Sequence, residues 1–459
     1  MRALLLALAL LAPWAAAAQQ NRPQPVPAAA APGPRSLTLA EAERRLVERN
    51  LAVIAAQRGV DAARAQRLIA SSRPPPSVSV GNTFAEFREL RGGPQPPRGR
   101  FLDSNVTVGL SVLIELGGKR ELRTRLAEEN IGVAEAQVLD ALRVQLLQLR
   151  QSFIAALGAR ANFEVALANR ASLDRTEALL RRQVQDGALP EGDLLRFQAS
   201  RLPFEAEVTA AATAYAAAVA QVAALLALDA ANTAPPGRAS ALPAVALDLR
   251  GRLETAAEPG VPRAALVEAA QNRPDVVAAL RQAQAAGANT SLAEAGRWRD
   301  VTLNGGWDRS RLSQDQPESS RSLIANNQFT FSLSVPIFTD RIVRGNIGVA
   351  QGQQAQAEAQ AQAALLQARA DVAAAWTAYE QSRALLRLYT GAALGRAEQA
   401  YRSTEQAFLA GGRSLIDVLD ALRTLNATRV AANNARAAYL SSLATLEAAS
   451  GVSGVSPRL

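Results

Sequence analysis

Two stretches of the chain alternate apolar residues with small or polar ones, which is typical of a strand with one apolar face. They are 105–112 (NVTVGLSV) and 328–335 (QFTFSLSV). The alternation predicts strands at about 104–116 and 328–338.

Each of these strands follows a candidate antiparallel partner, at about 77–90 and 301–312. Two β-hairpins are therefore expected. The connecting segments, 91–103 and 313–327, are rich in Gly, Pro, Arg, Asp, Ser and Asn, and they predict solvated loops.

Helical periodicity dominates the remaining sequence. Apolar residues recur at spacings of three and four in one stripe made of Val138, Leu142, Leu146, Leu149, Phe153 and Leu157. A continuous helix over 119–187 would be roughly 100 Å long at 1.5 Å per residue. That length predicts a coiled coil or a tube of helices.

Local signals mark where other helices begin and bend. Thr38 and Glu41 form a capping box that opens a helix running to about Ser72, where a proline run follows. Pro203 is expected to kink the helix that returns from the long one. The uncharged stretch 208–228 has the length of a membrane span, but it is mostly Ala, so a helix packed closely against its neighbours is preferred.

The two halves of the chain are repeats. Ser111-Val112-Leu113-Ile114 matches Ser334-Val335-Pro336-Ile337 at an offset of 334 − 111 = 223. The segment 53–56 (VIAA) matches 276–279 (VVAA) at the same offset, and Gly187 with 193–195 (DLL) matches Gly411 with 417–419 (DVL) at 224. Each half is predicted to contain a helix, a strand pair, a long helix, a Gly turn and a returning helix.

These signals divide the chain into segments. The predicted segments are an export signal at 1–18, a Pro/Ala-rich linker at 19–36, repeat 1 at 37–229, an inter-repeat linker at 230–262, repeat 2 at 263–451 and a tail at 452–459. The export signal has a charged start, a short apolar core and small residues before Gln19. It directs the mature chain out of the cytoplasm.

Composition excludes several kinds of chemistry. The chain has no His, no Cys and one Met, so soft-ligand metal sites, disulfides and a Ser-His-Asp triad are excluded, and so is a lipidated N-terminal cysteine. We expect no enzyme activity, no cofactor and no metal site. The net charge of +9 comes from arginines scattered among acids, with Lys119 the only lysine, so nucleic-acid binding is not expected.

Four exported strands with an apolar face must find partners. A sheet in lipid cannot leave its edges unpaired, and four strands cannot close a conducting barrel, so several chains must share one. The residues expected to face lipid are Val106, Val108, Leu110, Val112, Ile114, Phe329, Phe331, Leu333, Val335 and Ile337. Those expected to face a watery lumen are Asn105, Thr107, Gly109, Ser111, Gln328, Thr330, Ser332 and Ser334. A water-soluble sandwich is the alternative.

From about Leu37 to Gly451 the chain resembles outer-membrane efflux proteins of the TolC-like family. Three motifs carry the resemblance: 111–120 (SVLIELGGKR), which is similar to the strand-to-helix junction of the CzcC-like heavy-metal branch, the first tip from Gly187 to 193–195, and the second tip, 411–420 (GGRSLIDVLD). Leu113 departs from the pattern, since the other repeat has Pro336 there.

The resemblance implies a mostly α-helical fold with a membrane β-barrel portion. Three chains would form a twelve-strand barrel in the outer membrane of a Gram-negative bacterium and a twelve-helix tunnel reaching into the periplasm. The expected partners are two further copies of the chain, outer-membrane lipid, a periplasmic adaptor (membrane fusion) protein and an inner-membrane pump, preferably of the proton-driven RND type.

The resemblance also implies functions for residues at the tips. Asp417 and Asp420 match a ring of acids at the periplasmic gate, and Arg413 and Asp193 match groups that lock neighbouring hairpins together. The tip turns and adaptor contacts are expected at Gly187, Gly411 and Gly412. The alternative for Asp417 and Asp193 is plain stabilisation of a helix N-terminus.

The function implied is a passive exit duct of a tripartite efflux system, with heavy-metal cations favoured as substrate by 111–120. Drug efflux and type I protein secretion are alternatives for the same duct. A soluble periplasmic coiled-coil scaffold is an alternative of another class.

Overall fold

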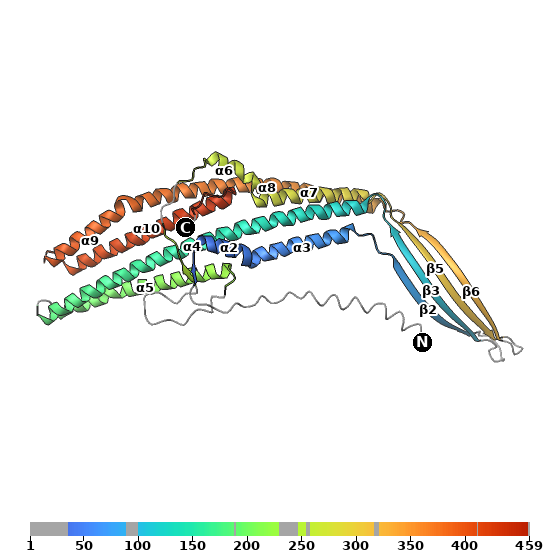
Figure 1. Cartoon of the computed structure of the whole chain (residues 1–459), viewed down its shortest axis with the longest axis horizontal. Helices are drawn as coiled ribbons and strands as arrows, with labels where there is room; N and C mark the ends of the chain where they lie inside the picture. Colours follow the sequence, from blue (N-terminus) through green and yellow to red (C-terminus); the bar gives the residue numbers. More distant parts are fainter. Residues whose placement is uncertain are drawn as a thin grey trace.

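The computed structural model describes residues 35–88, 100–187, 190–228, 247–253, 258–315, 321–410 and 412–457. The molecule is elongated, with a β-sheet at one end and the closed ends of two helical hairpins at the other (Figure 1). The predicted export signal, most of the N-terminal linker and Gly411 lie outside the described residues.

The two halves repeat one series of elements. The first half contains α2 (Leu39–Arg49), α3 (Leu51–Ser71), β2 (Ser77–Arg88), β3 (Arg100–Ile114), α4 (Lys119–Gln185) and α5 (Glu191–Leu225). The second contains α6 (Arg263–Ala269), η2 (Ala270–Asn272), α7 (Pro274–Ala295), β5 (Val301–Asp315), β6 (Arg321–Ser334), α8 (Asp340–Leu388), η3 (Tyr389–Ala393), α9 (Leu394–Leu409) and α10 (Leu415–Ser450). Two short strands, β1 (Arg35–Leu37) and β4 (Leu247–Leu249), pair in parallel.

The helix predicted from Thr38 to Ser72 is two helices, which corrects the sequence-based expectation. The capping box at Thr38 and Glu41 is present. The break falls at Asn50, whose side chain accepts hydrogen bonds from the backbone N–H groups of Ala52 and Val53 and so begins α3. The same amide donates to Leu225 O at 2.9 Å, so a contact with α5 fixes the break.

The four long strands form one antiparallel sheet in the order β2-β3-β5-β6, and the two hairpins meet at β3 and β5. The strands reach further than expected at the hairpin ends, because residues 100–103, 313–315 and 321–327 pair instead of looping. Their polar composition predicts loops. Backbone pairing does not depend on side-chain polarity, so these residues can nevertheless extend the strands.

β6 ends at Ser334 rather than near residue 338. Pro336 has no N–H to continue the ladder, and Phe338 has a φ of +58°, which turns the chain away from the strand.

In the half of the sheet nearest the helices, the strand register gives one apolar and one polar face, as the alternation predicts. Further out the apolar face becomes polar, in the row Asn82, Val106, Arg309 and Asn327. One row across the sheet is Val80, Val108, Trp307 and Phe329, and the next residues along form the row Gly81, Thr107, Asp308 and Gln328. The apolar face is open in a single chain, where Phe331 is 85% exposed and Val80 75%.

Helix α4 runs for 67 residues without a break, in agreement with the long helix predicted over 119–187. Its counterpart in the second half is interrupted by a π-helical turn at Tyr389–Ala393, where Gly391 has φ −78° and ψ −112°. The two long helices therefore differ within an otherwise repeated plan.

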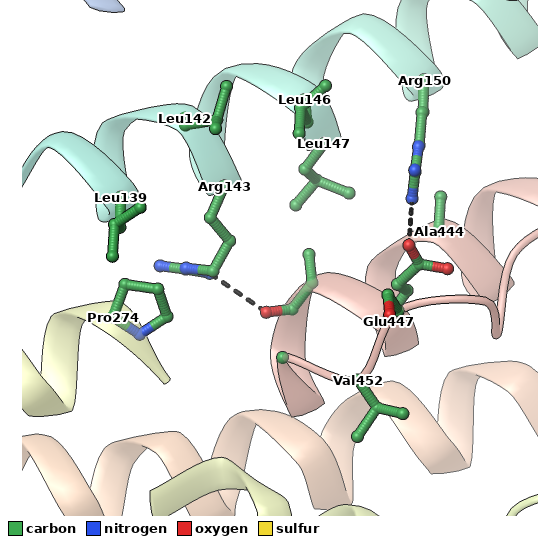
Figure 2. A pocket seen from close by; sticks show the side chains of 13 residues that line it. Leu139, Leu142, Arg143, Leu146, Leu147, Arg150, Pro274, Ala444, Glu447 and Val452 are labelled. Carbon is green, nitrogen blue, oxygen red and sulfur yellow. Dashed lines mark hydrogen bonds and ion pairs between the residues drawn. The ribbon is translucent and has the colours of Figure 1, made fainter. Parts of the chain in front are cut away.

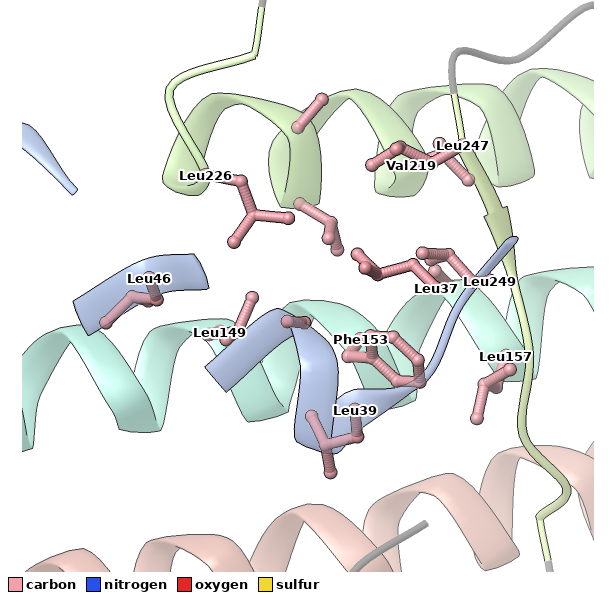
Figure 3. Close-up of a cluster of buried hydrophobic side chains, with 14 of the residues drawn as sticks. Leu37, Leu39, Leu46, Leu149, Phe153, Leu157, Val219, Leu226, Leu247 and Leu249 are labelled. Carbon is pink, nitrogen blue, oxygen red and sulfur yellow. The ribbon is translucent and has the colours of Figure 1, made fainter. Parts of the chain in front are cut away.

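Midway along the helices, a hydrophobic core joins α2, α4, α5 and the β1–β4 pair (Figure 3). Leu37 and Leu249 come from the two strands and are fully buried against Phe153 and Leu157 of α4. Both strands lie in or beside segments predicted as linkers. Burying their leucines anchors the start of repeat 1 to the segment that precedes repeat 2.

Helix α5 continues through Pro203 without interruption. By length and composition it is the one described helix that could cross a membrane. In the structure α5 packs lengthwise against α4, and Phe204, Val208, Tyr215 and Val219 are buried along it.

Candidate functional site

The first hairpin tip joins α4 to α5 around a glycine. Gly187 has a φ of +73°, which L side chains rarely adopt, and its N–H donates to Val184 O at 3.1 Å. Helix α5 then starts after Pro190, with Asp193 in its first turn. The backbone at 187 therefore requires glycine.

The second tip joins α9 to α10. The N–H of Gly412 donates to Ala407 O at 2.8 Å and so closes the end of α9. Helix α10 begins with a second capping box, in which the Asp417 N–H donates to Ser414 Oγ (3.3 Å) and the Ser414 N–H donates to Asp417 Oδ2 (3.1 Å). Asp417 therefore has a structural role in its own chain.

The Asp417 carboxylate is held in its charged form. The backbone N–H and the hydroxyl of Ser414 both donate to it, and Arg413 lies 4.0 Å away, so the pKa of Asp417 is lowered from its usual value. Its side chain is 42% exposed. A charged oxygen is therefore available at the tip at neutral pH.

Asp420 lies one turn further along α10, and its side chain is 66% exposed. Arg423 pairs with it at 3.5 Å, and the same guanidinium lies 5.9 Å from the ring centroid of Phe204 on α5. Arg423 therefore connects the acidic end of α10 with the other hairpin.

The structure does not bring Arg413 and Asp193 together within one chain. Arg413 pairs with Asp417 on its own helix, and Asp193 pairs with Arg196 at 3.6 Å on α5. Among the described residues, these are the ion pairs of the two groups. The predicted lock between these two groups is therefore not formed within one chain.

Sequence reasoning missed an ion-pair cluster that joins α4 to α5 above the first tip. Glu177 accepts hydrogen bonds from Gln198 (2.9 Å), Arg181 (2.6 Å) and Arg201 (2.6 Å). These donors hold the pKa of Glu177 at about 2, although its side chain is only 11% exposed. The i,i+4 spacing of Glu177 and Arg181 is the one local signal in the sequence for this cluster, since Gln198 and Arg201 come from the returning helix.

Apolar packing fixes the two tips relative to each other. Phe197 and Phe204 of α5 share a buried cluster with Leu419 and Leu422 of α10 and with Leu180 of α4. The tip carboxylates on α10 are thus mounted on a helix that is packed against the first hairpin.

At the other end of the helices, the motif at 111–120 forms the junction between sheet and helix. Gly117 has φ +75°, and a Cβ there would lie 2.5 Å from the Trp298 ring. Lys119 pairs with Asp300 at 2.8 Å, and the Leu116 N–H donates to the same carboxylate. The junction therefore joins the first repeat to the second where the sheet meets the helices.

The middle of the molecule carries a cavity of about 260 Å³ between α4 and the end of α10 (Figure 2). Leu139, Leu142 and Leu146 line it, and Arg150 crosses it to pair with Glu447 at 2.6 Å. Glu447 also accepts a hydrogen bond from the Ser456 N–H at 2.7 Å. This cavity therefore belongs to the structural contact between α4 and the residues that follow α10.

The described residues contain no group of three or more acidic side chains placed to hold a metal ion. The candidate functional groups are therefore the exposed acids of the second tip and the two faces of the sheet.

Comparison with known proteins gives a consistent result. A family model described as outer membrane efflux protein matches residues 44–228 and 265–452. Outer membrane protein TolC of Vibrio cholerae is 31% identical over 189 residues, 41% of this chain and 43% of that protein. Nodulation protein T of Rhizobium leguminosarum is 26% identical over 331 residues, 71% of this chain and 64% of that protein. Both alignments span less than two thirds of the relative's length.

Solved structures share the fold at low identity. The Campylobacter jejuni CmeC outer membrane channel superposes with a TM-score of 0.68 at 18% identity, covering 90% of this chain and 85% of CmeC. The open state of the Neisseria gonorrhoeae MtrE outer membrane channel gives 0.65 at 21% identity, with 94% of both chains covered. CusC gives 0.66 at 18% identity, with 94% of this chain and 98% of CusC covered.

Proposed function

The chain belongs to the outer membrane efflux protein family, and we propose that three copies of it form the exit duct of a tripartite efflux system. It is an outer-membrane protein, which argues against a soluble periplasmic scaffold. In this proposal the duct is passive. A periplasmic adaptor protein and an inner-membrane pump, of the RND type by resemblance, deliver substrate to the tips.

The open sheet carries the proposal. Strands β2 and β6 each have a single partner among the described strands, and the apolar face includes the exposed Val78, Val80 and Phe331. In lipid, unpaired backbone groups are costly, so the edges must meet the edges of other copies. Three copies supply twelve strands, enough for a barrel with a lumen.

The helices support the same arrangement. Helix α4 packs against both α5 and α10, and α10 packs against α9, so each chain presents four helices side by side near the tips. Three such layers would close a twelve-helix tunnel.

The tip carboxylates support a gate in this tunnel. Three copies of Asp417 and Asp420 would put six carboxylates around one axis, which attracts cations and sets selectivity. Arg413 and Asp193 would then lock neighbouring chains, and the turns at Gly187, Gly411 and Gly412 would contact the adaptor. Exposed pairs of this kind contribute about 1 kcal/mol or less each, so several must act together.

We propose heavy-metal cations as one substrate class, on the resemblance at 111–120. Such ions would pass with carboxylate oxygens as weak contacts. Organic drugs are the second class. Comparing metal and drug susceptibility of a deletion strain with its parent tests both, and a neighbouring gene for an ATP-driven exporter would favour type I secretion.

Light scattering of the purified full chain in detergent tests the assembly. We expect a protein mass three times that of one chain, which is 48.3 kDa with its export signal. A strict monomer would contradict the exit duct.

Planar bilayers test the gate. Asp417→Ala with Asp420→Ala is expected to raise conductance at low voltage and to reduce cation preference. The matched control is Asp61→Ala with Glu135→Ala, which removes two exposed carboxylates from α3 and α4 far from the tips. No change in either property would remove Asp417 and Asp420 from the gate.

A further inference from the structure

A long groove runs between α5, α4 and α10, with a cavity volume of about 690 Å³. Most of its wall is small and apolar, with Ala159 and Ala166 from α4, Ala210 and Ala214 from α5, and Ala427 and Val430 from α10. Helices α4 and α10 approach closely at its floor, where a Cβ on Gly158 would lie 3.3 Å from the Ala437 methyl group. A volume of this size accommodates a drug-sized molecule.

The groove lies on the face of α4 opposite the β1–β4 pair. Phe153 and Leu157 pack against the two strands, and Arg160 hydrogen-bonds to Leu249 O. Ala155, Ala159 and Ala166 lie about half a turn around the helix from those residues. A closed tunnel has no room for β1 and β4 inside, so the face of α4 that packs against them points outwards. The groove lies on the opposite face and therefore faces the lumen; this step rests on the proposed exit duct.

The Asn426 side chain in the groove wall lacks a hydrogen-bond partner. This residue of α10 is 5% exposed, and neither its Oδ1 nor its Nδ2 makes a hydrogen bond to another described residue. Nearby amides are satisfied, since Asn162 donates to Asn434 at 2.9 Å and accepts from Asn433 at 3.1 Å. A buried, unpaired amide is costly. Both of its polar atoms lie beneath the groove surface, so a ligand gains hydrogen bonds to them when the side chain turns towards the groove.

The groove also carries an unneutralised negative charge. Glu207 of α5 lines it and is exposed, and no ion pair or hydrogen bond joins its side chain to another described residue. The nearby cation, Arg423, is already engaged by Asp420 and the Phe204 ring. An apolar wall, a free carboxylate and an unpaired amide together suit a ligand that has an apolar body, a positive charge and hydrogen-bonding atoms.

We propose that this groove binds an amphipathic organic cation, whose apolar body lies on the alanines and whose ammonium group pairs with Glu207. The Asn426 side chain then turns towards the groove to meet the ligand's polar atoms. Such a site in the tunnel wall would hold organic cations inside the duct, above the tip carboxylates.

Fluorescence anisotropy of rhodamine 6G, an amphipathic cation, with the purified full chain in amphipol tests the proposal. We expect saturable binding, weakened about fivefold by Glu207→Gln, the upper range for an exposed ion pair. Ala210→Trp fills the groove from an exposed position and is expected to weaken binding at least about tenfold. Glu164→Gln removes a 60%-exposed carboxylate from the opposite face of α4 and should leave binding unchanged.

The neutral probe N-phenyl-1-naphthylamine separates charge from shape. Ala210→Trp should weaken its binding, whereas Glu207→Gln should not. The site would be overturned if rhodamine 6G showed no saturable binding. It would also be overturned if either groove variant, with native helicity and mass, bound the dye with wild-type affinity. The exit duct is tested separately by conductance, which is measured without the dye, so the two failures are distinguishable.

Discussion

At the scale of single residues, the charge of Glu177 contributes to stability in a defined pH range. Its folded pKa of about 2 lies below the usual 4.5, so the stabilisation is present above about pH 4.5 and is lost as the pH falls towards 2. Glu177→Gln should lower the free energy of unfolding by about 2 kcal/mol at pH 7. Helical circular dichroism during unfolding at pH 7 and pH 3 measures this.

The difference between the wild type and Glu177→Gln should shrink at the lower pH. Glu164→Gln is the matched control, since its carboxylate is mostly exposed and, among the described residues, pairs only with Arg160 on the same helix. A variant that loses the same stability at both pH values would show that the charge of Glu177 is not responsible.

Asn426 gives a prediction of opposite sign. Both amide atoms are buried without partners among the described residues, so Asn426→Leu, which keeps the branching at Cγ, should raise the free energy of unfolding by about 1 to 2 kcal/mol. Asn162→Leu should lower it, because the amide of Asn162 is bonded to Asn433 and Asn434. Thermal unfolding of the two variants should move in opposite directions, and a destabilised Asn426→Leu would refute the account.

At the scale of elements, the two long helices are expected to differ in local stability. The π turn at Tyr389–Ala393 interrupts the regular hydrogen-bond ladder of α8 and α9, whereas the corresponding part of α4 is continuous. Hydrogen exchange followed by mass spectrometry should show peptides over 386–396 exchanging at least about ten times faster than peptides over 163–173. Equal protection would mean that the turn does not weaken the helix.

Elements defined by local patterns were predictable from the sequence. The alternation at 105–112 and 328–335 sets which side chains share a sheet face, and the apolar stripe ending at Leu157 sets the buried side of α4. The break at Asn50 was not predictable, because it depends on Leu225 O, 175 residues away. The π turn was missed as well, since Gly391 lies in a run of small residues that fits a regular helix.

The candidate site divides in the same way. The glycine turn at 187 and the position of Asp417 in the first turn of a helix follow from local sequence, and both are present in the structure. Gln198 and Arg201, which donate to Glu177, lie on the returning helix α5. Their pairing with Glu177 depends on the register of the hairpin, which local sequence does not define. Contacts of Arg413 and Asp193 with other chains stay predictions.

At the scale of the whole molecule, the orientation of the sheet can be tested with adjacent residues. Phe331 belongs to the apolar face and Thr330 to the polar face. Phe331→Asp places a charge in lipid and should reduce recovery in the outer-membrane fraction. Its cost is below that of Arg or Lys, which is about 2 to 4 kcal/mol at the bilayer centre. Thr330→Asp should be recovered like the wild type, and the reverse result would invert the assigned faces.

The π turn has a consequence for the assembled duct. In the proposed trimer, two repeats per chain would place six similar hairpins around the axis, and the ends nearest the membrane would approach sixfold symmetry. Only every second hairpin contains the interruption at Gly391, so this pseudo-sixfold pattern is reduced to threefold towards the periplasm. A ring of six identical partner molecules would therefore meet two alternating kinds of docking position, and its members could not all be bound alike.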